Sequence, residues 1–245
     1  MFGRKTVLSG RLLRPRGGVI VPLSTGPHSE VTIVNTRGNR LGTPPLWPLM
    51  VAAAGYMFFV RPQLRKWGTR LGEAMRRLPG DDIIPDPQID MTHAANIDAP
   101  PEAVWPWLAQ MGRDHSGYYS LDMLRNHGIP SVTYLRQDLE PPLEGMQLDG
   151  GEHILTVENN RTLLLAAYDL ERLPGLSQDI TTLYQLERQP DGSTRLLLRH
   201  RASTRGAAAP LFNLLYELLH VAGVLQQFAF LKEHSTTMAH LRLGG

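Results

Sequence analysis

The sequence predicts an α+β fold in which an antiparallel sheet packs against one long C-terminal helix. Two observations lead to this prediction. Short apolar, β-branched or alternating runs recur after residue 130, and turn signals such as Asp149-Gly150-Gly151 and Pro190-Asp191-Gly192 separate several of them. Residues 209–241 then follow a helical period. Strands joined by short turns pair antiparallel, so the C-terminal helix is left to cover the sheet.

The composition is that of a protein with a packed core. The chain has 245 residues, of which 42% are hydrophobic and 20% are charged. It contains no cysteine, which excludes disulfide bonds, thiol nucleophiles and cysteine-ligated metals. It also lacks the G-x-S-x-G motif and the phosphate-binding P-loop, so neither a serine hydrolase nor a nucleotide-driven enzyme is indicated.

The positive charge is concentrated in the N-terminal third. Residues 1–77 contain 13 of the 25 Lys and Arg residues but only two of the 23 acidic residues, Glu30 and Glu73. The remaining residues therefore form an acidic body. Such a body lacks the excess of cations that binding to a phosphate backbone requires, so no nucleic-acid partner is expected.

Three segments precede the body. Residues 1–43 show no sustained period and are predicted to form a flexible basic tail. Residues 44–60, "PPLWPLMVAAAGYMFFV", are uncharged and predict an apolar helix of 17 residues, the lower limit for crossing a bilayer. Residues 61–88 are predicted to be a basic stretch followed by a linker rich in proline and aspartate.

The apolar helix makes a membrane an expected partner. More cations follow residues 44–60 than precede them, so a spanning helix would place the C-terminal body in the cytoplasm, anchored to the cytoplasmic membrane. The alternatives are an interfacial helix, a buried helix and a helix that packs on the body.

From residue 89 the pattern predicts regular elements. Residues 89–97 predict a strand, 101–112 a short helix bent at Pro106, and 118–126 a second helix. The apolar face of the first helix consists of Val104, Trp107, Leu108 and Met111. Further strands are predicted at 131–136, 152–158, 161–169, 180–188 and 194–204.

The long helix at 209–241 has two kinds of surface. The apolar side carries Leu211, Leu214, Leu215, Leu218, Ala222, Leu225 and Ala229. A narrow polar stripe consists of Asn213, Glu217, His220 and Gln227. The apolar side is expected to face the sheet and a cavity at once.

The order of strand, two short helices, antiparallel strands and long helix is that of a helix-grip body, in which a curved sheet wraps the last helix. The stretch "LPGDDIIPDPQIDMTHAANIDAPPEAVWPWLAQMGRDHSGYYSLDMLRN" resembles bacterial SRPBCC (START-like) proteins, a subgroup of which carries runs of the form "IDAPPEAVWPWL-QMG" followed by "GxYSxDxL". "DGSTRLLLRHRA" is similar to their late strand. The resemblance covers roughly 78–241 and implies a START-like domain at 89–241. Residues 138–151 depart from it, at the expected cavity mouth.

The resemblance implies a cavity between the sheet and the C-terminal helix that binds, and in a transfer protein exchanges, a hydrophobic small molecule or lipid. One alternative is an enzyme on the same fold, similar to the polyketide cyclases and dehydratases. Another is a structural role, with side chains filling the cavity.

The candidate site residues follow from these placements. Ligand binding is expected from Trp107, Tyr118, Tyr119, Tyr134, His200, Leu215, Leu218, Leu219 and Ala222. If the protein is an enzyme, the candidate acid–base groups are Tyr119, Asp122 and His200, because a hydroxyl, a carboxylate or an imidazole at a cavity can move a proton. The alternative is that the tyrosines pack the second helix and Asp122 bonds the local backbone.

The nine histidines show neither H-E-x-x-H nor a His-x-His pair, so no metal site and no cofactor are predicted. In the strand at 194–204, alternation places His200 on the face of Leu198 and puts Arg195, Arg199 and Arg201 on the other. His200 would then be a polar anchor in the cavity, whereas the arginines are expected on the convex, solvent-exposed face.

Overall fold

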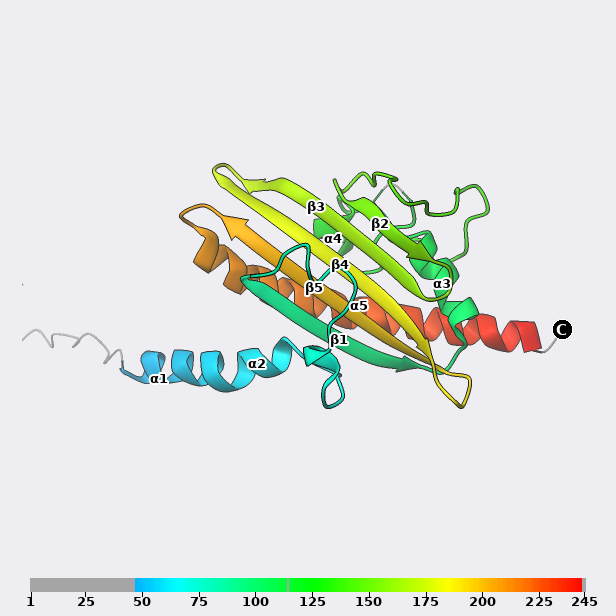
Figure 1. The fold of residues 1–245 in the computed structure, drawn as a ribbon, viewed down its shortest axis with the longest axis horizontal. Coiled ribbons are helices and arrows are strands. Elements are labelled where there is room, and N and C mark those ends of the chain that lie inside the picture. The colour runs from blue at the N-terminus through cyan, green and yellow to red at the C-terminus, as the bar shows by residue number, and fades with distance from the viewer. Residues whose placement is uncertain (1–46, 114, 244–245) are drawn as a thin grey trace, which may run out of the picture. The chain divides into compact units, whose positions relative to one another are not determined.

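The computed structural model describes residues 47–113 and 115–243 (Figure 1). The chain divides into two compact units, Met1–Met50 and Val51–Gly245. Of the first unit only residues 47–50 are described, so the predicted flexible tail at 1–43 lies outside the described residues. The second unit contains the sheet, the helices that pack on it and the candidate site.

The second unit is built from five strands with helices around them. The strands are β1 (Ile89–Ile97), β2 (His153–Glu158), β3 (Thr162–Leu173), β4 (Leu176–Arg188) and β5 (Thr194–Arg205). The helices near the sheet are α3 (Pro101–Ala109), α4 (Asp122–Arg125) and α5 (Ala209–Leu243). Before the sheet come α1 (Trp47–Gly55), a π-helical turn η1 (Tyr56–Val60), α2 (Arg61–Leu64) and a 3-10 turn η2 (Glu73–Met75).

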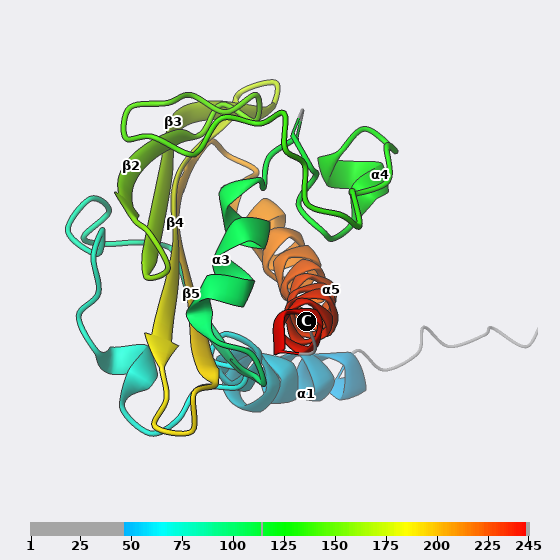
Figure 2. The same cartoon turned by 90° about the vertical axis from the view of Figure 1, so that its right-hand side faces the viewer.

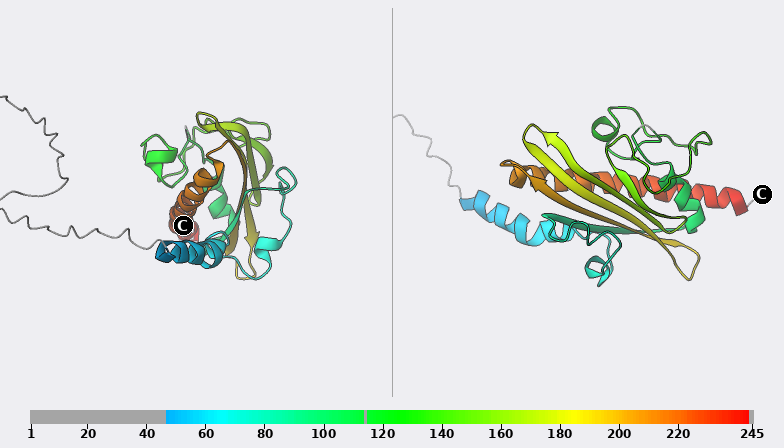
Figure 3. Two further views of the ribbon diagram at one scale, coloured as in Figure 1. Left: turned by 90° about the vertical axis from the view of Figure 1, so that its left-hand side faces the viewer. Right: turned by 45° about the horizontal axis from the view of Figure 1, so that its top comes forward.

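The five strands form one antiparallel sheet in the order β1-β5-β4-β3-β2. Its inner face is apolar because alternate residues point inward: Leu196 and Leu198 of β5 belong to the same buried cluster as Val224 and Phe228 of α5. Figures 1 and 3 show α5 running along this inner face. The protein therefore has the predicted α+β helix-grip fold.

α3 packs against one end of the sheet and against α5, as Figure 2 shows. Val104 and Leu108 are fully buried, and Trp107 and Met111 are nearly so. Trp107 contacts Phe230 of α5 edge to face, with ring centroids 5.5 Å apart. The predicted apolar face of this helix is confirmed.

The free edge of β1 is covered by residues 65–67. The backbone N–H of Thr92 donates to the carbonyl of Arg65 at 2.8 Å, and that of Ala94 donates to the carbonyl of Trp67 at 3.2 Å. The chain then crosses onto the outer face of the sheet. Two amides of an edge strand thus find partners within the same chain.

Residues 68–88 lie on the outer face of the sheet, where the sequence predicted a linker. Leu78 is buried in one cluster with Leu164 of β3 and Leu183 of β4. Ile84 is also buried. The linker prediction was wrong because a segment rich in proline and aspartate still carries apolar residues that can pack on a sheet.

The outer-face arginines of β5 are buried rather than solvent-exposed. Arg195 donates to Glu73 at 2.5 and 3.0 Å. Arg199 donates to Asp81 at 2.6 Å, and Arg201 forms an ion pair with the same carboxylate at 3.2 Å. The prediction of exposure failed because the acidic partners lie more than 100 positions earlier in the chain.

α5 faces the sheet with the side opposite to the predicted one. The polar residues Glu217 and Gln227 are only 3% and 1% exposed. By contrast, Leu211, Leu215 and Leu218 are 65%, 54% and 42% exposed. The predicted apolar side is therefore the outer side of the helix.

The polar residues of α5 can be buried because they have partners. Glu217 accepts hydrogen bonds from Arg61 at 2.7 Å and from Arg65 at 2.5 Å. Asn213 accepts from Thr204 of β5 at 2.7 Å. Hydrogen bonds and opposite charges offset the cost of removing a charge or an amide from water, so apolarity alone does not decide which side of a helix faces the core.

The predicted strand at 131–136 is not a strand. The backbone N–H of Ser131 donates to the Asp122 carboxylate at 2.9 Å, and that of Arg136 donates to Gln110 at 3.0 Å. The side chains of Asp122 and Gln110 thus accept hydrogen bonds that the backbone of a neighbouring strand would otherwise accept.

The second predicted helix, at 118–126, is reduced to the single turn of α4. Tyr119 and Leu121 have φ angles of 57° and 48°, in the left-handed region. A right-handed helix cannot continue through such residues, so α4 begins at Asp122.

The apolar segment predicted at 44–60 is helical over its described part, residues 47–60, and none of these residues is buried. By length and composition, α5 is the one helix in the described part of the chain that could cross a membrane. In this fold α5 packs on the sheet as the core helix.

Candidate functional site

A cavity of about 220 Å³ opens between α5, the inner faces of β4 and β5, and the loop that leads to α4. Its size lies somewhat below the range of about 300–1,000 Å³ typical of small-molecule sites. Apolar and polar side chains share the lining. The polar and charged ones are Arg113, Tyr118, Arg125, Glu152, Arg172, Thr182, Tyr184, His200, Tyr216, His220 and Gln227.

His200 lies at the inner wall of the cavity between two hydroxyl groups. Its Nδ1 is 3.0 Å from the Thr182 hydroxyl of β4, and its Nε2 is 3.0 Å from the Tyr216 hydroxyl of α5. Burial lowers the pKa of His200 to about 3, and the nearby Arg125 and Arg172 act in the same direction. The imidazole is therefore neutral at physiological pH and serves as a fixed polar anchor.

His220 stacks on His200, with ring centroids 4.3 Å apart. Burial also lowers the pKa of His220 well below its ordinary value, with a smaller contribution from His200. The Nε2 atom of His220 is buried and has no hydrogen-bond partner among the described residues. A buried polar atom without a partner at a cavity wall is a candidate contact for a bound molecule.

Stability is expected to fall as the pH decreases below about 6.5, the pKa of histidine in an unfolded chain. Between that pH and the lowered folded-state pKa of about 3, the unfolded chain binds a proton that folded His200 does not. Each such histidine lowers the free energy of unfolding by up to about 1.4 kcal/mol per pH unit. His220 and His93, whose pKa values burial also lowers, act in the same direction.

Urea denaturation at about pH 7 and about pH 5.5 measures this dependence in the wild-type chain and in His200→Gln. The variant is expected to show a smaller loss of stability between the two pH values. An identical loss would mean that His200 is not buried in its neutral form.

The cavity is lined by three arginines and a single carboxylate. Arg113, Arg125 and Arg172 line it together with Glu152. The Arg125 guanidinium lies 4.2 Å from the centre of the Tyr118 ring, a cation–π contact. The cavity therefore carries an excess of positive charge, although the body as a whole is acidic.

Each of these arginines donates to a neutral partner and keeps other N–H groups. Arg113 Nε donates to the carbonyl of Arg125 at 3.2 Å. Arg125 Nη1 donates to the Ser120 hydroxyl at 3.2 Å, and Arg172 Nε donates to Gln178 at 3.0 Å. A guanidinium has five N–H donors, so each arginine can also bind an anionic group.

Tyr118 connects the arginines to the carboxylate. Its hydroxyl donates to Glu152 at 2.7 Å. Burial, and next the negative charge of Glu152, raise the pKa of Tyr118, so the hydroxyl stays protonated. Gly150 leaves room for this pair, since a Cβ there would lie 2.5 Å from the tyrosine oxygen.

Gln227 connects the three parts of the cavity wall. Its Oε1 accepts from the Tyr184 hydroxyl of β4 at 3.1 Å, and its Nε2 donates to the carbonyl of Tyr118 at 2.9 Å. α5, the sheet and the loop are thus held in fixed positions around the cavity.

Three of the predicted ligand-binding residues line this cavity: Tyr118, His200 and Leu219. Each comes from a different part of the chain, namely the loop, β5 and α5. His200 reaches the cavity because strand alternation points it inward, as the sequence predicted.

The other predicted ligand-binding residues lie elsewhere. Trp107 and Tyr119 are core residues, and the Tyr119 ring stacks on Phe230 at 4.2 Å. The Tyr119 hydroxyl donates to the carbonyl of Trp107 at 3.0 Å, so it supports α3. Tyr134 is 65% exposed. Leu215, Leu218 and Ala222 are on the outer side of α5 and do not line the cavity.

Asp122 organises the loop after α4 rather than the cavity. It accepts hydrogen bonds from the backbone and the hydroxyl of Ser131 at 2.9 and 2.6 Å, and from the side chain of Asn126. This arrangement matches the alternative in which Asp122 bonds the local backbone. Of the three candidate acid–base groups, only His200 lines the cavity.

Sequence reasoning missed most of the polar lining. The sequence pattern places His220 and Gln227 on the polar stripe of α5, but the expectation that the apolar side faces the cavity puts this stripe on the wrong side of the helix. The spacing of Arg113, Arg125 and Arg172 gives no signal, because the fold alone brings them together.

Comparison with known proteins gives no assignment. No family model matches the chain, and no curated protein matches it significantly. Among solved structures, a protein from Mesorhizobium loti is 16% identical, with a TM-score of 0.35 over 59% of this chain and 94% of its own. CalU16 from Micromonospora echinospora is 19% identical, with a TM-score of 0.29 over 62% of this chain and 87% of its own. The di-domain ARO/CYC BexL from the BE-7585A biosynthetic pathway is 17% identical, with a TM-score of 0.37 over 63% and 52%.

Proposed function

We propose that this protein binds a compact small molecule that has an aromatic or apolar body and an anionic group. The observation that supports this most is the excess of arginine at the cavity, Arg113, Arg125 and Arg172 against Glu152. A carboxylate or another anion is the group that several guanidinium donors recognise best.

The inner part of the cavity suits the body of such a molecule. Tyr184 and Tyr216 present aromatic rings there, and Ile180, Leu198 and Val224 present apolar surface. His220 adds a polar atom without a described partner. The volume of about 220 Å³ favours a compact ligand over a lipid with long acyl chains.

The alternative, an enzyme similar to the polyketide cyclases, has less support from the site. A general base works best when its pKa lies near the operating pH. His200 has a pKa of about 3, and the pKa values of Tyr118 and Tyr216 are raised by burial. These groups are poor proton acceptors and donors at neutral pH, so they are better suited to holding a ligand.

Isothermal titration calorimetry with two matched probes tests the proposal. Naphthoate and naphthalenemethanol share a ring system, and only the first carries a negative charge. The full chain is expected to bind naphthoate about tenfold more tightly or better, as a charge-assisted hydrogen bond allows. Arg172→Gln should remove most of this preference.

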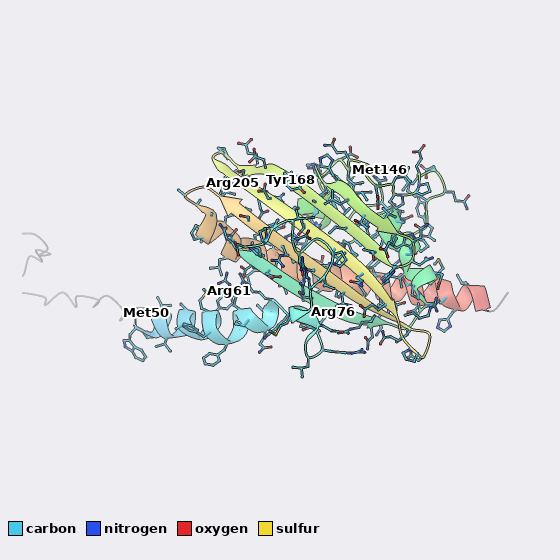
Figure 4. All side chains as sticks on the ribbon, in the orientation of Figure 1. Met50, Arg61, Arg76, Met146, Tyr168 and Arg205 are labelled. Atoms are coloured by element: carbon cyan, nitrogen blue, oxygen red, sulfur yellow. The ribbon has the colours of Figure 1, made fainter. Side chains whose placement is uncertain are left out.

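Arg76→Gln is the matched control, because Arg76 (labelled in Figure 4) pairs with Glu187 and does not line the cavity. It should bind both probes as the wild type does. Equal affinity of the wild-type chain for the two probes, or no binding of either, would count against an anionic ligand in this cavity.

A further inference from the structure

The outer side of α5 is both apolar and exposed. Five leucines on this side are between 42% and 65% exposed: Leu211, Leu215, Leu218, Leu219, which also lines the cavity at its edge, and Leu225. At 3.6 residues per turn, these five positions fall along one side of the helix. We refer to these five residues as the leucine face.

The leucine face contains no charge. From residue 209 to residue 231, the only charged residue of α5 is Glu217, and it is buried against Arg61 and Arg65. A helix that packs its inner side on a sheet normally shows charged and polar residues to water on its outer side. An uncharged row of leucines this long indicates a surface that something apolar covers.

A second apolar element reaches α5 at the same place. Residues 51–60 are uncharged, and their large side chains are exposed: Val51, Met57, Phe58, Phe59 and Val60 are between 42% and 77% exposed. The helix continues into α2, whose first residue, Arg61 (labelled in Figure 4), pairs with Glu217, the neighbour of Leu218. None of residues 51–60 is buried, so the segment has no inner side.

A third apolar element lies beyond the leucine face. Met123 and Leu124 of α4 are 81% and 63% exposed. The loop that begins α4 is attached to α5, since the backbone N–H of Leu121 donates to Gln226 at 2.9 Å. Figure 2 shows α4 and α5 on the same side of the sheet, with α4 farther from it.

Cations flank the apolar residues along the sequence. Arg37 and Arg40 precede residues 44–60 along the sequence, and Lys66, which is exposed, follows them, whereas Arg61 and Arg65 pair with Glu217. An apolar helix bounded by cations complements a bilayer whose headgroups are anionic.

We propose that the leucine face of α5 and residues 51–60 together bind the surface of an anionic lipid bilayer, with both helices lying in the plane of the interface. A second copy of the chain could cover the leucine face, but residues 51–60 would then still expose apolar side chains to water. A bilayer covers both elements at once. This inference does not depend on the ligand proposed for the cavity.

Vesicle flotation of the full chain tests the proposal, with vesicles of phosphatidylcholine and phosphatidylglycerol. The wild-type chain should float with the vesicles. The triple variant Leu211→Gln, Leu215→Gln, Leu218→Gln should bind about tenfold less or weaker, since it removes three apolar side chains from the interface. The control is Leu71→Gln with Met75→Gln, whose side chains are 107% and 92% exposed near the outer face of the sheet. It should bind as the wild type does.

A label distinguishes insertion from loss of fold. The sequence has no cysteine, so Leu218→Cys accepts a single environment-sensitive fluorophore. Its emission should shift to the blue when the vesicles are added, and that of labelled Leu71→Cys should not.

Equal shifts for the two labels would overturn the proposal, as would unchanged flotation of the triple variant. Light scattering tests whether the leucine face instead binds a second copy of the chain. If the wild-type chain is a dimer that does not float and the triple variant is a monomer, the leucine face binds a second copy and the proposal is wrong.

Discussion

Replacement of Asp81 by alanine is expected to lower the free energy of unfolding by about 3–5 kcal/mol. The carboxylate of Asp81 lies 2.6 Å from Arg199 and 3.2 Å from Arg201, and both arginines are buried. Asp81→Ala would leave two cations without their shared counter-ion. In urea denaturation, the variant should unfold at a lower midpoint concentration of urea, and the m value should be unchanged.

Asp138→Ala is the matched control for this substitution. Asp138 also pairs with an arginine, Arg136, but its side chain is 66% exposed. Water can solvate both charges after the substitution, so no resolvable change in stability is expected. Similar midpoints for the Asp81→Ala and Asp138→Ala variants would show that residues 68–88 do not cover the outer face of the sheet.

Leu231→Ala is expected to cost about 2–5 kcal/mol, whereas Leu218→Ala on the same helix is expected to cost less than about 1 kcal/mol. Leu231 is 0% exposed and packs in the main core, and Leu218 is 42% exposed. The two substitutions remove the same atoms from the same helix. Their difference therefore reports which side of α5 faces the sheet.

Urea denaturation of the two variants measures this difference in the free energy of unfolding. A larger loss for Leu218→Ala than for Leu231→Ala would restore the side of α5 that the sequence predicted, and it would remove the basis for the leucine face. Helix content from circular dichroism should be the same in both variants, because leucine and alanine are both good helix formers.

Local periodicity was sufficient for most elements of the fold. β1 is observed at the predicted residues 89–97, and α5 covers the predicted helix at 209–241. Both follow from spacing along the chain, which a sequence displays directly. The strand predicted at 131–136 failed because side chains of Asp122 and Gln110 occupy its backbone groups, and spacing carries no sign of that.

The side that each element buries was harder to predict. The rule that apolar residues face inward fails for the N-terminal half of α5, since Glu217 is buried with two arginines while Leu215 is exposed. It also fails for Arg199, whose partner Asp81 is 118 positions away. Pairing between distant charges depends on the tertiary structure and leaves no local pattern.

The candidate site shows the same limit. His200 was found because its strand alternates, and Tyr118 because it lies in a recognisable motif. The sequence does not indicate that Arg172 and Glu152 line the cavity. They come together only in the folded chain, where β3 and the start of β2 approach the loop before α4.

The hydrogen bonds that Arg65 and Trp67 accept along β1 also determine where the folding unit begins. A fragment starting at residue 78 would lack these two carbonyls and would expose the amides of Thr92 and Ala94 on a bare edge strand. An edge strand of another molecule is the readiest new partner for such amides, so the shortened chain is expected to self-associate. The basic segment before the acidic body is therefore expected to reduce aggregation of that body, because it covers the edge of β1.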